Sequence, residues 1–386
     1  MIGIHAATRT AIGAFQGQLS SYSATDLGSF AIRAALESAQ LKTVDEVFMG
    51  CVLQAGLGQA PARQASIKAG LDENVPTTTI NKVCGSGMRA VMFACDSLRL
   101  GHIKTAVAGG MESMTNAPYA LEKARFGYRF GHGNLIDIML HDGLEDAFHK
   151  NAKGGRCAMG VFADNTAQEY GFSRQDQENF ARQTFENALA AQQNNAFSTE
   201  IFPITFTDKK GENCINQDEQ ILRVKPEKFA ALKPAFGTDG TVTAATSSSL
   251  ADGAAALVLS ANTDNALAKI VGYTSFAQTP ETFTTAPIGA IEKLCKSLNW
   301  SIDSVDAFEI NEAFAVVPMA VMKALNIERE KVNMHGGACA LGHPIGASGA
   351  RIVVTLLNIM RQKNFKRGIA AACIGGGEAT AIALEI

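Results

Sequence analysis

Residues 81–90 read NKVCGSGMRA, and they place Cys84 at the junction of two patterns. The preceding run Thr77-Thr78-Thr79-Ile80 is β-branched, which favours a strand. After the two glycines, apolar residues recur at the spacing of one helix face: Val91, Ala94, Cys95 and Leu98. A thiol at the start of a helix feels the positive end of the helix dipole, which favours the reactive thiolate. A lone cysteine is more often an inert core residue, so this stretch alone assigns no role.

The same pattern returns near the end of the chain. Residues 84–111 align with 346–374, so that Gly-Ser-Gly-Met-Arg at 85–89 lies over Ala-Ser-Gly-Ala-Arg at 347–351, 262 positions later. Upstream, Val44-Asp45 aligns with Val305-Asp306 at an offset of 261. Two separate blocks with nearly the same offset indicate an internal duplication of a βαβ-type unit.

The duplication also predicts an insertion. In the second copy, Gly368–Ile374 runs through three glycines into Ala379–Ile386, as a hairpin would. The matching strands of the first copy, Thr105–Met111 and Gly253–Ser260, are separated by about 140 residues, a length that indicates structure and function of its own. We therefore expect an N-terminal half (1–113 plus 242–263), an inserted region (114–241) and a C-terminal half (264–386).

Composition bounds the class of protein. The chain has 386 residues, 47% hydrophobic and 18% charged, with a net charge of −3, as in ordinary globular proteins of two or more domains. It carries no basic block for nucleic acid and no apolar run near the ~20 residues of a membrane span. The strand pattern begins at Met1, so no signal peptide is expected. Eight cysteines without a C-x-x-C pair suggest free thiols in a reducing cytoplasm.

Local patterns predict alternating strands and helices, and hence a parallel-rich sheet covered by helices on both faces. The expected elements of the two halves are helices at Asp26–Ala39, Ala60–Ala69 and Pro287–Ser297, strands at Val44–Leu53 and Val305–Ile310, and a helix opened by Asn311-Glu312-Ala313-Phe314. Within the insertion, helices are expected at Gly160–Tyr170 and Ser173–Gln193, the second with a capping box of Ser173 and Asp176.

Two parts of the insertion can be interpreted either as functional sites or as ordinary solvent-exposed surface. Arg125–Asn134 is rich in glycine, aromatic residues and arginine, and is typical of a surface or oligomer loop. The later part is basic, which suits either a solvated face or a site for a phosphorylated ligand: Lys209, Lys210, Arg223, Lys225 and Lys228.

A second glycine-dense stretch, Asn333–Arg351, contains two histidines. His343 precedes a proline in the loop that mirrors the Cys84 turn, which favours a functional role. His335 is left open, because a lone histidine is more often structural. Cys373 ends a predicted strand before three glycines and by itself would pass as a core thiol.

Taken together, these segments resemble the thiolase family along the whole chain. The motifs are NKVCGSGMRA around Cys84, GGMESM at 109–114, NEAF at 311–314, GHPIGASGAR at 342–351 and CIGGGEA at 373–379. They look most similar to the acetyl-CoA acetyltransferases of that family. The resemblance implies a duplicated α/β/α/β/α fold of five layers and an inserted loop domain that holds coenzyme A. It also implies dimers or tetramers, and no metal or other cofactor, since coenzyme A thioesters are the substrates.

The resemblance implies a ping-pong condensation of two acetyl-CoA, with a role for each catalytic residue. Cys84 would take the acyl group, His343 would be its general base, and Cys373 would be acid and base toward the second substrate. Asn311 would hold a water that stabilises the enolate oxygen together with His343. The backbone N–H groups of Cys84 and Gly375 would form the oxyanion hole. The implied substrate contacts are Ser248, for the pantetheine arm, Arg223, for a coenzyme A phosphate, and Met159, Phe236 and Ala244.

The sequence departs from the family pattern at two positions. Many biosynthetic members carry a histidine where Ala158 stands here, which leaves the pocket wider or drier. Thr246 replaces a frequent asparagine.

Three other functions remain as alternatives. A thiolase acting on longer 3-oxoacyl-CoA would use the same residues. A ketosynthase-like enzyme usually lacks the second active cysteine, so Cys373 argues against it. A non-catalytic acyl-CoA or lipid carrier would need none of the four catalytic side chains.

Overall fold

The computed structural model describes residues 1–208 and 211–386. Lys209 and Lys210, two of the basic residues weighed as a ligand site, lie outside the described residues. None of the described helices combines the length and the apolar composition that a bilayer crossing requires.

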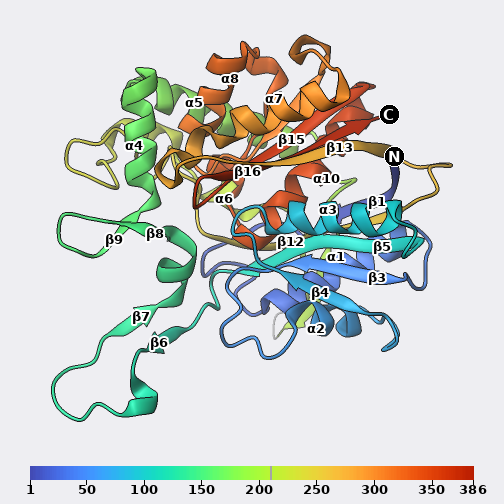
Figure 1. Ribbon diagram of the computed structural model, residues 1–386, viewed down its shortest axis with the longest axis horizontal. Helices are drawn as coiled ribbons and strands as arrows, with labels where there is room; N and C mark the ends of the chain where they lie inside the picture. The colour runs from blue at the N-terminus through green and yellow to red at the C-terminus, as the bar shows by residue number, and fades with distance from the viewer. Residues whose placement is uncertain (209–210) are drawn as a thin grey trace.

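Two similar halves stack on each other, one blue to cyan and one orange to red in Figure 1. The N-terminal half contains β1 (Ile2–Arg9), β2 (Gly13–Ala14), α1 (Ala24–Ser38), β3 (Glu46–Gly50), α2 (Pro61–Lys68), β4 (Thr77–Ile80), α3 (Ser86–Arg99), β5 (Thr105–Ser113) and β12 (Ala251–Ser260). The C-terminal half contains β13 (Ala268–Ala277), the 3₁₀ helix η4 (Pro280–Thr285), α7 (Ala286–Leu298), β14 (Ala307–Ile310), α8 (Val316–Leu325), α9 (Ala338–Leu341), α10 (Ile345–Lys363), β15 (Arg367–Ile374) and β16 (Glu378–Glu385).

The helices form three layers around the strands, as the five-layer prediction requires. Helices α3 and α10 lie between the strands of the two halves, with α1 and α2 outside one half and α7 and α8 outside the other (Figure 1). Contacts between α10 and strands β5, β12, β14 and β15 place this helix at the centre of the molecule. The two central helices approach closely through counterpart glycines, since a Cβ on Gly87 would lie 2.8 Å from the Ala350 nitrogen and one on Gly349 would lie 2.6 Å from the Met88 nitrogen.

The strands run in the order β14-β15-β16-β13-β1-β12-β5-β3-β4. The prediction of a parallel-rich sheet is wrong, because the parallel pairs among the described strands are β3–β4, β3–β5 and β14–β15, and the other ladders are antiparallel. Parallel neighbours need a crossover helix, whereas β15 and β16 are joined by the predicted glycine turn. Strand β12 pairs antiparallel with β5, as β16 does with β15.

The duplication is visible in side-chain contacts as well as in topology. The Asp45 carboxylate accepts hydrogen bonds from the backbone N–H groups of Lys104 (2.7 Å) and Thr105 (2.9 Å). Its counterpart Asp306 accepts the same bonds from Lys366 (2.8 Å) and Arg367 (2.9 Å). Asp45 therefore fixes the start of β5, and Asp306 fixes the start of β15.

Two predicted elements end or begin elsewhere because tertiary contacts take their backbone groups. The strand predicted at Val44–Leu53 ends at Gly50, since the N–H groups of Val52 and Leu53 bind the Glu112 carboxylate. The segment 311–314 does not open a helix: the Ala313 carbonyl accepts from Ser248 N–H at 3.0 Å, and α8 begins only at Val316.

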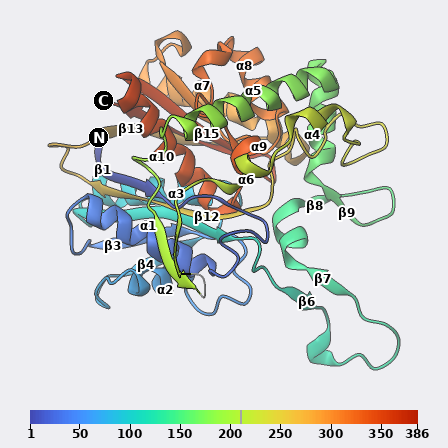
Figure 2. The same ribbon diagram turned by 180° about the vertical axis from the view of Figure 1, so that it is seen from behind.

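The chain between β5 and β12 leaves the two halves and returns. It contains β6 (Tyr119–Leu121), β7 (Leu135–Asp137), β8 (Glu145–Lys150), β9 (Arg156–Ala158), α4 (Met159–Tyr170), α5 (Arg174–Gln193), β10 (Ile204–Asp208), β11 (Gly211–Ile215) and α6 (Glu219–Arg223). The β6–β7 segment projects away from the body, while α5 lies against the C-terminal half (Figure 2). The predicted capping box of Ser173 and Asp176 at the start of α5 is confirmed.

Candidate functional site

Cys84 lies in the sharp turn between β4 and α3. Val83 has φ +46°, a left-handed conformation that is strained for a β-branched residue. The Ser86 hydroxyl holds this turn, because it accepts from Lys82 N–H (2.8 Å) and donates to the Val83 carbonyl (2.6 Å). The strain is therefore maintained by specific contacts, and it presents the cysteine at the helix start.

The Cys84 thiol is protonated at neutral pH in the resting structure. Burial raises the pKa of Cys84 to about 11, although the N–H groups of Gly375 and of Cys84 itself bind the sulfur and act in the opposite direction. The favourable setting at the helix start, predicted to promote thiolate, is thus outweighed by desolvation. A reaction at this sulfur needs a base that removes its proton at the moment of attack.

His343 meets the requirements of that base. Its Nδ1 lies 2.6 Å from the Ser348 hydroxyl, which donates its own proton to the Pro344 carbonyl at 3.0 Å. The histidine therefore donates from Nδ1, which leaves Nε2 as the acceptor of the ring. Burial lowers the pKa of His343 to about 3, so the ring is neutral and able to accept a proton.

Asn311 and Cys373 lie behind this pair and are fully buried. Asn311 Nδ2 lies 3.4 Å from His343 Nε2, while its Oδ1 has no hydrogen-bond partner. Cys373 is the penultimate residue of β15, and burial, followed by the influence of Cys84, raises its pKa well above the ordinary value. The effect of Cys84 on the pKa of Cys373 indicates that the two thiols are neighbours.

One cavity of about 680 Å³ joins most of the predicted residues. Cys84, His343 and Gly375 line it, together with the predicted substrate contacts Met159, Phe236 and Ser248. Much of the rest of its wall is apolar or aromatic and comes from both halves and the insertion, including Leu144, Phe148, Ala158, Phe283 and Phe314. Such a channel suits a long ligand with a few polar groups.

Several predicted residues lie outside this cavity wall. Ala244 is exposed, and Arg223 pairs with Glu219 within α6. His335 packs edge-on against Phe197, with ring centroids 5.8 Å apart. Cys373 and Asn311 lie behind the wall rather than on it. Among residues 1–208 and 211–386, no three His, Cys, Asp or Glu side chains converge as metal ligands would.

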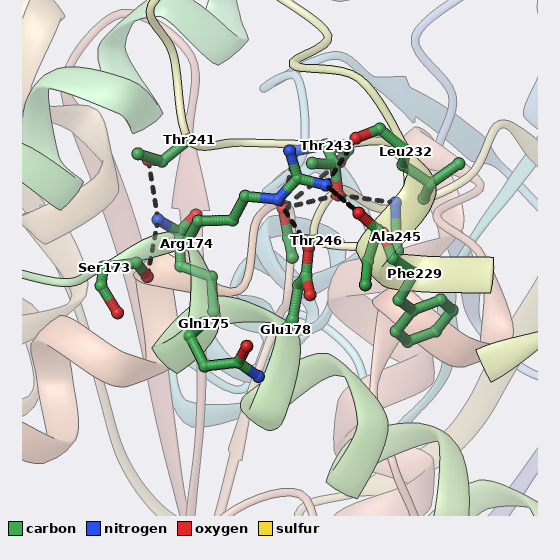
Figure 3. A network of polar contacts seen from close by, with 12 residues as sticks. Ser173, Arg174, Gln175, Glu178, Phe229, Leu232, Thr241, Thr243, Ala245 and Thr246 are labelled. Atoms are coloured by element: carbon green, nitrogen blue, oxygen red, sulfur yellow. Dashed lines mark hydrogen bonds and ion pairs between the residues drawn. The ribbon is translucent and has the colours of Figure 1, made fainter. Parts of the chain in front are cut away.

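A polar network fixes the loop that carries Phe236, Ala244 and Ser248 (Figure 3). Arg174 of α5 binds Glu178 at 2.7 Å and donates to carbonyls at 229 and 232. Thr246, the departure from the family pattern, accepts from Thr243 N–H at 2.8 Å and is fully buried. The threonine therefore stabilises the turn that leads into Ser248.

Sequence reasoning missed three features of the site. Ser348 orients His343, and Glu112 binds the backbone N–H of Val52 after β3. Both residues stand within the quoted motifs. Lys82 and Glu378 form an ion pair across the two halves, and Glu378 lines the cavity. These residues stand within or beside the quoted motifs, but only the fold shows what each side chain contacts.

The arrangement is suited to covalent acyl transfer. It offers a thiol with two N–H groups at the sulfur, a neutral histidine whose Nε2 can accept a proton, and a second buried thiol beside the first. A nucleophile, a base and donors for a developing oxyanion are the parts that such chemistry needs.

Comparison with known proteins agrees with this geometry. Residues 2–263 match the family model "Thiolase, N-terminal domain", and residues 264–386 match "Thiolase, C-terminal domain". "Acetyl-CoA acetyltransferase 2" of Arabidopsis thaliana is 48% identical over 98% of this chain and 95% of its own length. "Acetyl-CoA acetyltransferase" of Escherichia coli is 45% identical, with 99% and 98% covered. The crystal structure of Acat5 thiolase from Ascaris suum in complex with coenzyme A superposes with a TM-score of 0.92 at 38% identity, covering 100% and 99% of the two chains.

Proposed function

The chain belongs to the thiolase family, and from that premise we propose that it condenses two acetyl-CoA reversibly to acetoacetyl-CoA and free coenzyme A. The relatives that bear the name acetyl-CoA acetyltransferase match nearly their whole length. The observation that carries the proposal is the meeting of Cys84, His343 and Gly375 in one cavity. Acetyl-CoA and coenzyme A are its substrates and products.

In the first half-reaction, the Cys84 sulfur attacks the acetyl thioester carbon. His343 Nε2 takes the thiol proton and returns it to the departing coenzyme A sulfur. The N–H groups of Cys84 and Gly375 stabilise the oxyanion of the tetrahedral intermediate. This step leaves an acetyl thioester on Cys84 and splits one difficult transfer into two easier ones.

In the second half-reaction, Cys373 gives its own proton to His343 Nε2, and the resulting thiolate removes a Cα proton from a second acetyl-CoA. Asn311, through a water at its unpartnered Oδ1, and His343 stabilise the enolate oxygen. The enolate carbon attacks the acetyl group on Cys84 and releases the Cys84 thiolate, which takes the proton back from His343. Because Cys373 is buried beside Cys84, it can act on the Cα that lies against the acyl-enzyme.

Coenzyme A would enter between the insertion and the two halves. Ser248, Met159 and Phe236 line the cavity, and we keep Ala244 and Arg223 as contacts nearer the solvent. The projecting β6–β7 segment would join subunits into a dimer or tetramer. Eight free thiols fit a cytoplasmic location.

A thiolysis assay with acetoacetyl-CoA and free coenzyme A tests the activity directly. We expect release of acetyl-CoA with ping-pong initial rates, and mass spectrometry should place an acetyl group on the Cys84 peptide after brief exposure to acetyl-CoA. Acetylation only on Cys373 or Cys157 would contradict the assigned nucleophile. A carrier protein would show no thiolysis, and a ketosynthase would require a carrier-protein substrate.

A second candidate, thiolysis of longer 3-oxoacyl-CoA, is favoured by Ala158. Its small side chain lines the cavity. Turnover on acetoacetyl-CoA should be compared with turnover on longer 3-oxoacyl-CoA, in the wild type and in Ala158→His. If the longer substrates are the better ones only in the wild type, the second candidate holds.

A further inference from the structure

Glu112 is a fully buried carboxylate that the proposed reaction does not use. It stands near the end of β5, in the GGMESM stretch. Its Oε2 accepts from the backbone N–H groups of Val52 (3.1 Å) and Gly346 (2.9 Å). Its Oε1 accepts from Leu53 N–H at 3.1 Å and from the Cys51 thiol at 3.7 Å. A single side chain therefore joins the loop after β3 to the C-terminal half.

The contact with Gly346 is at the N-terminus of α10. The first N–H groups of a helix have no partner within the helix, and a negative charge there is stabilising. The N-cap residue Pro344 provides no side-chain acceptor, and the first turn of α10 contains no acidic residue. Glu112, which belongs to the N-terminal half, supplies both the hydrogen-bond acceptor and the negative charge. Position 346 needs a glycine, because a Cβ there would lie 2.8 Å from Glu112 Oε2.

The segment that Glu112 anchors also carries His343. His343 is followed directly by Pro344 and α10, and its ring is oriented by Ser348 in the first turn of this helix. Its backbone N–H donates to the Ser249 carbonyl at 2.9 Å. A shift in the start of α10 would consequently move the histidine relative to Cys84, which belongs to the N-terminal half.

The duplication shows that this contact has a counterpart at the nucleophile. At the offset of 262, Cys84 corresponds to Gly346 and Glu112 corresponds to Ile374. Near the end of β15, Ile374 packs on Gly85, and the next N–H, of Gly375, binds the Cys84 sulfur. The end of β5 thus contacts the start of α10, and the end of β15 contacts the start of α3.

We propose that Glu112 is a positioning residue, whose carboxylate anchors the start of α10, and with it His343, to the half that carries Cys84. The proposal rests on the proposed function for the roles of Cys84 and His343. The anchoring contact itself is independent of that function.

The charge of Glu112 and the length of its side chain can be tested separately. Burial raises the pKa of Glu112 to about 7, and its negative charge in turn contributes to the raised pKa of Cys84. The titratable groups facing it are the thiols of Cys51, after β3, and Cys84, before α3. On α10, Glu112 contacts the backbone N–H of Gly346, which does not titrate. Glu112→Gln keeps the length and removes the charge, whereas Glu112→Asp keeps the charge and is one methylene shorter.

The first measurement is the rate of Cys84 alkylation by iodoacetamide against pH, followed by mass spectrometry of the Cys84 peptide. In Glu112→Gln, one oxygen can still accept from Gly346, so we expect kcat in thiolysis within about fivefold of wild type. The midpoint of the alkylation rate against pH should move to lower pH, because the negative charge of Glu112 near the Cys84 thiol has been removed. In Glu112→Asp the midpoint should stay, while kcat falls by about 10- to 100-fold with little change in KM, as a misplaced base requires.

Asp45→Asn is the matched control, because Asp45 also anchors two backbone N–H groups but at the opposite end of β3 and β5. It should lower the melting temperature without changing kcat per folded molecule.

If Glu112→Asp keeps kcat within about threefold of wild type at equal folded fraction, the proposal is overturned. If Glu112→Asp does not fold, Gly346→Ala displaces the same contact and should give the same fall in kcat; an unchanged kcat there also overturns it. A wild type inactive in thiolysis would contradict the proposed function, while the shift of the alkylation midpoint in Glu112→Gln needs no turnover and would still be measurable.

Discussion

The two thiols at the site differ in what their surroundings allow. Cys84 contacts the cavity, whereas Cys373 is fully buried and its pKa is raised well above the ordinary value by burial. A deeply buried thiol is a poor free nucleophile but can exchange a proton with a group pressed against it. This difference leads to separable defects when each cysteine is replaced.

Cys373→Ser should lose the carbon–carbon step and keep the acyl-enzyme. Positioned proton transfer contributes about 10²–10⁴-fold, so condensation should fall by that order. The variant should still acetylate Cys84 from acetyl-CoA, and it should lose detritiation of acetyl-CoA labelled at Cα. Cys84→Ala, the comparison variant, should lose the acyl-enzyme itself. Full Cα proton exchange in Cys373→Ser would show that the role is wrong.

Ser348→Ala should weaken the base without removing it. The hydroxyl keeps the His343 proton on Nδ1, so its loss lets the ring rotate or take the other tautomer. We expect kcat for thiolysis to fall by about 10- to 100-fold, since misplacement by about 1 Å can cost that much, with KM changed far less. Ser348→Thr, which keeps a hydroxyl, should recover part of the rate. An equal rise in KM would instead indicate damage to substrate binding.

The chemical types of the site residues could be predicted from the motifs, but their ionisation could not. The position of Cys84 at a helix start suggested a thiolate, and the structure shows that desolvation dominates. Desolvation depends on which distant segments cover a group, and these come from both halves and the insertion. The same limit applies to Ser348 and Glu112, whose partners are defined only by tertiary contacts.

At the scale of elements, the duplication predicted the repeated strands and helices within a few residues. The errors lie where a side chain or a neighbouring loop takes backbone groups that a regular element would use. Glu112 ends β3 in this way, and hydrogen bonds with the 246–248 segment keep 311–314 out of a helix. Local propensity contains no information on such partners, because they lie far away in the sequence.

The β6–β7 segment is the element with the clearest expected effect on assembly. It projects from the body (Figure 1), and Phe126 and Phe130 on it are 87% and 103% exposed. Exposed aromatic residues in one place mark a contact surface. Deleting residues 125–134 should lower the oligomeric mass in light scattering and leave the melting temperature of the fold nearly unchanged. The double variant Phe126→Ser, Phe130→Ser should act in the same direction; an unchanged mass in both would count against this role.

At the scale of the whole molecule, the repeat predicted which helix starts would correspond, and the fold shows that they meet. Cys84 and the loop of His343 belong to different halves, and the insertion closes the cavity over both. The antiparallel pairing of most strands was not predicted, because βαβ patterns reveal the crossover connections and not the order in which two copies join. The long-range pairing of β1 with β13 connects the strands of the halves.

Acid stability should depend on two buried neutral histidines. Burial lowers the pKa of His343 to about 3 and that of His335 to about 4. The unfolded chain binds these protons from about pH 6.5 downward, so the unfolded state takes up more protons in this window. The free energy of unfolding is therefore fully present above pH 6.5 and falls as the pH is lowered toward 4.

His335→Phe tests this dependence without affecting the cavity, because His335 does not line it and packs edge-on against Phe197. A phenyl ring keeps the packing and cannot titrate. In wild type, His335 should account for a loss of about 2 kcal/mol in unfolding free energy between pH 7 and 5, and the variant should lack that part. Urea unfolding at both pH values measures the difference. The raised pKa values of Glu112 and Glu309 act with the opposite sign, but they are common to both proteins and cancel in the comparison. An equal pH dependence of the two proteins would show that His335 is not held neutral by burial.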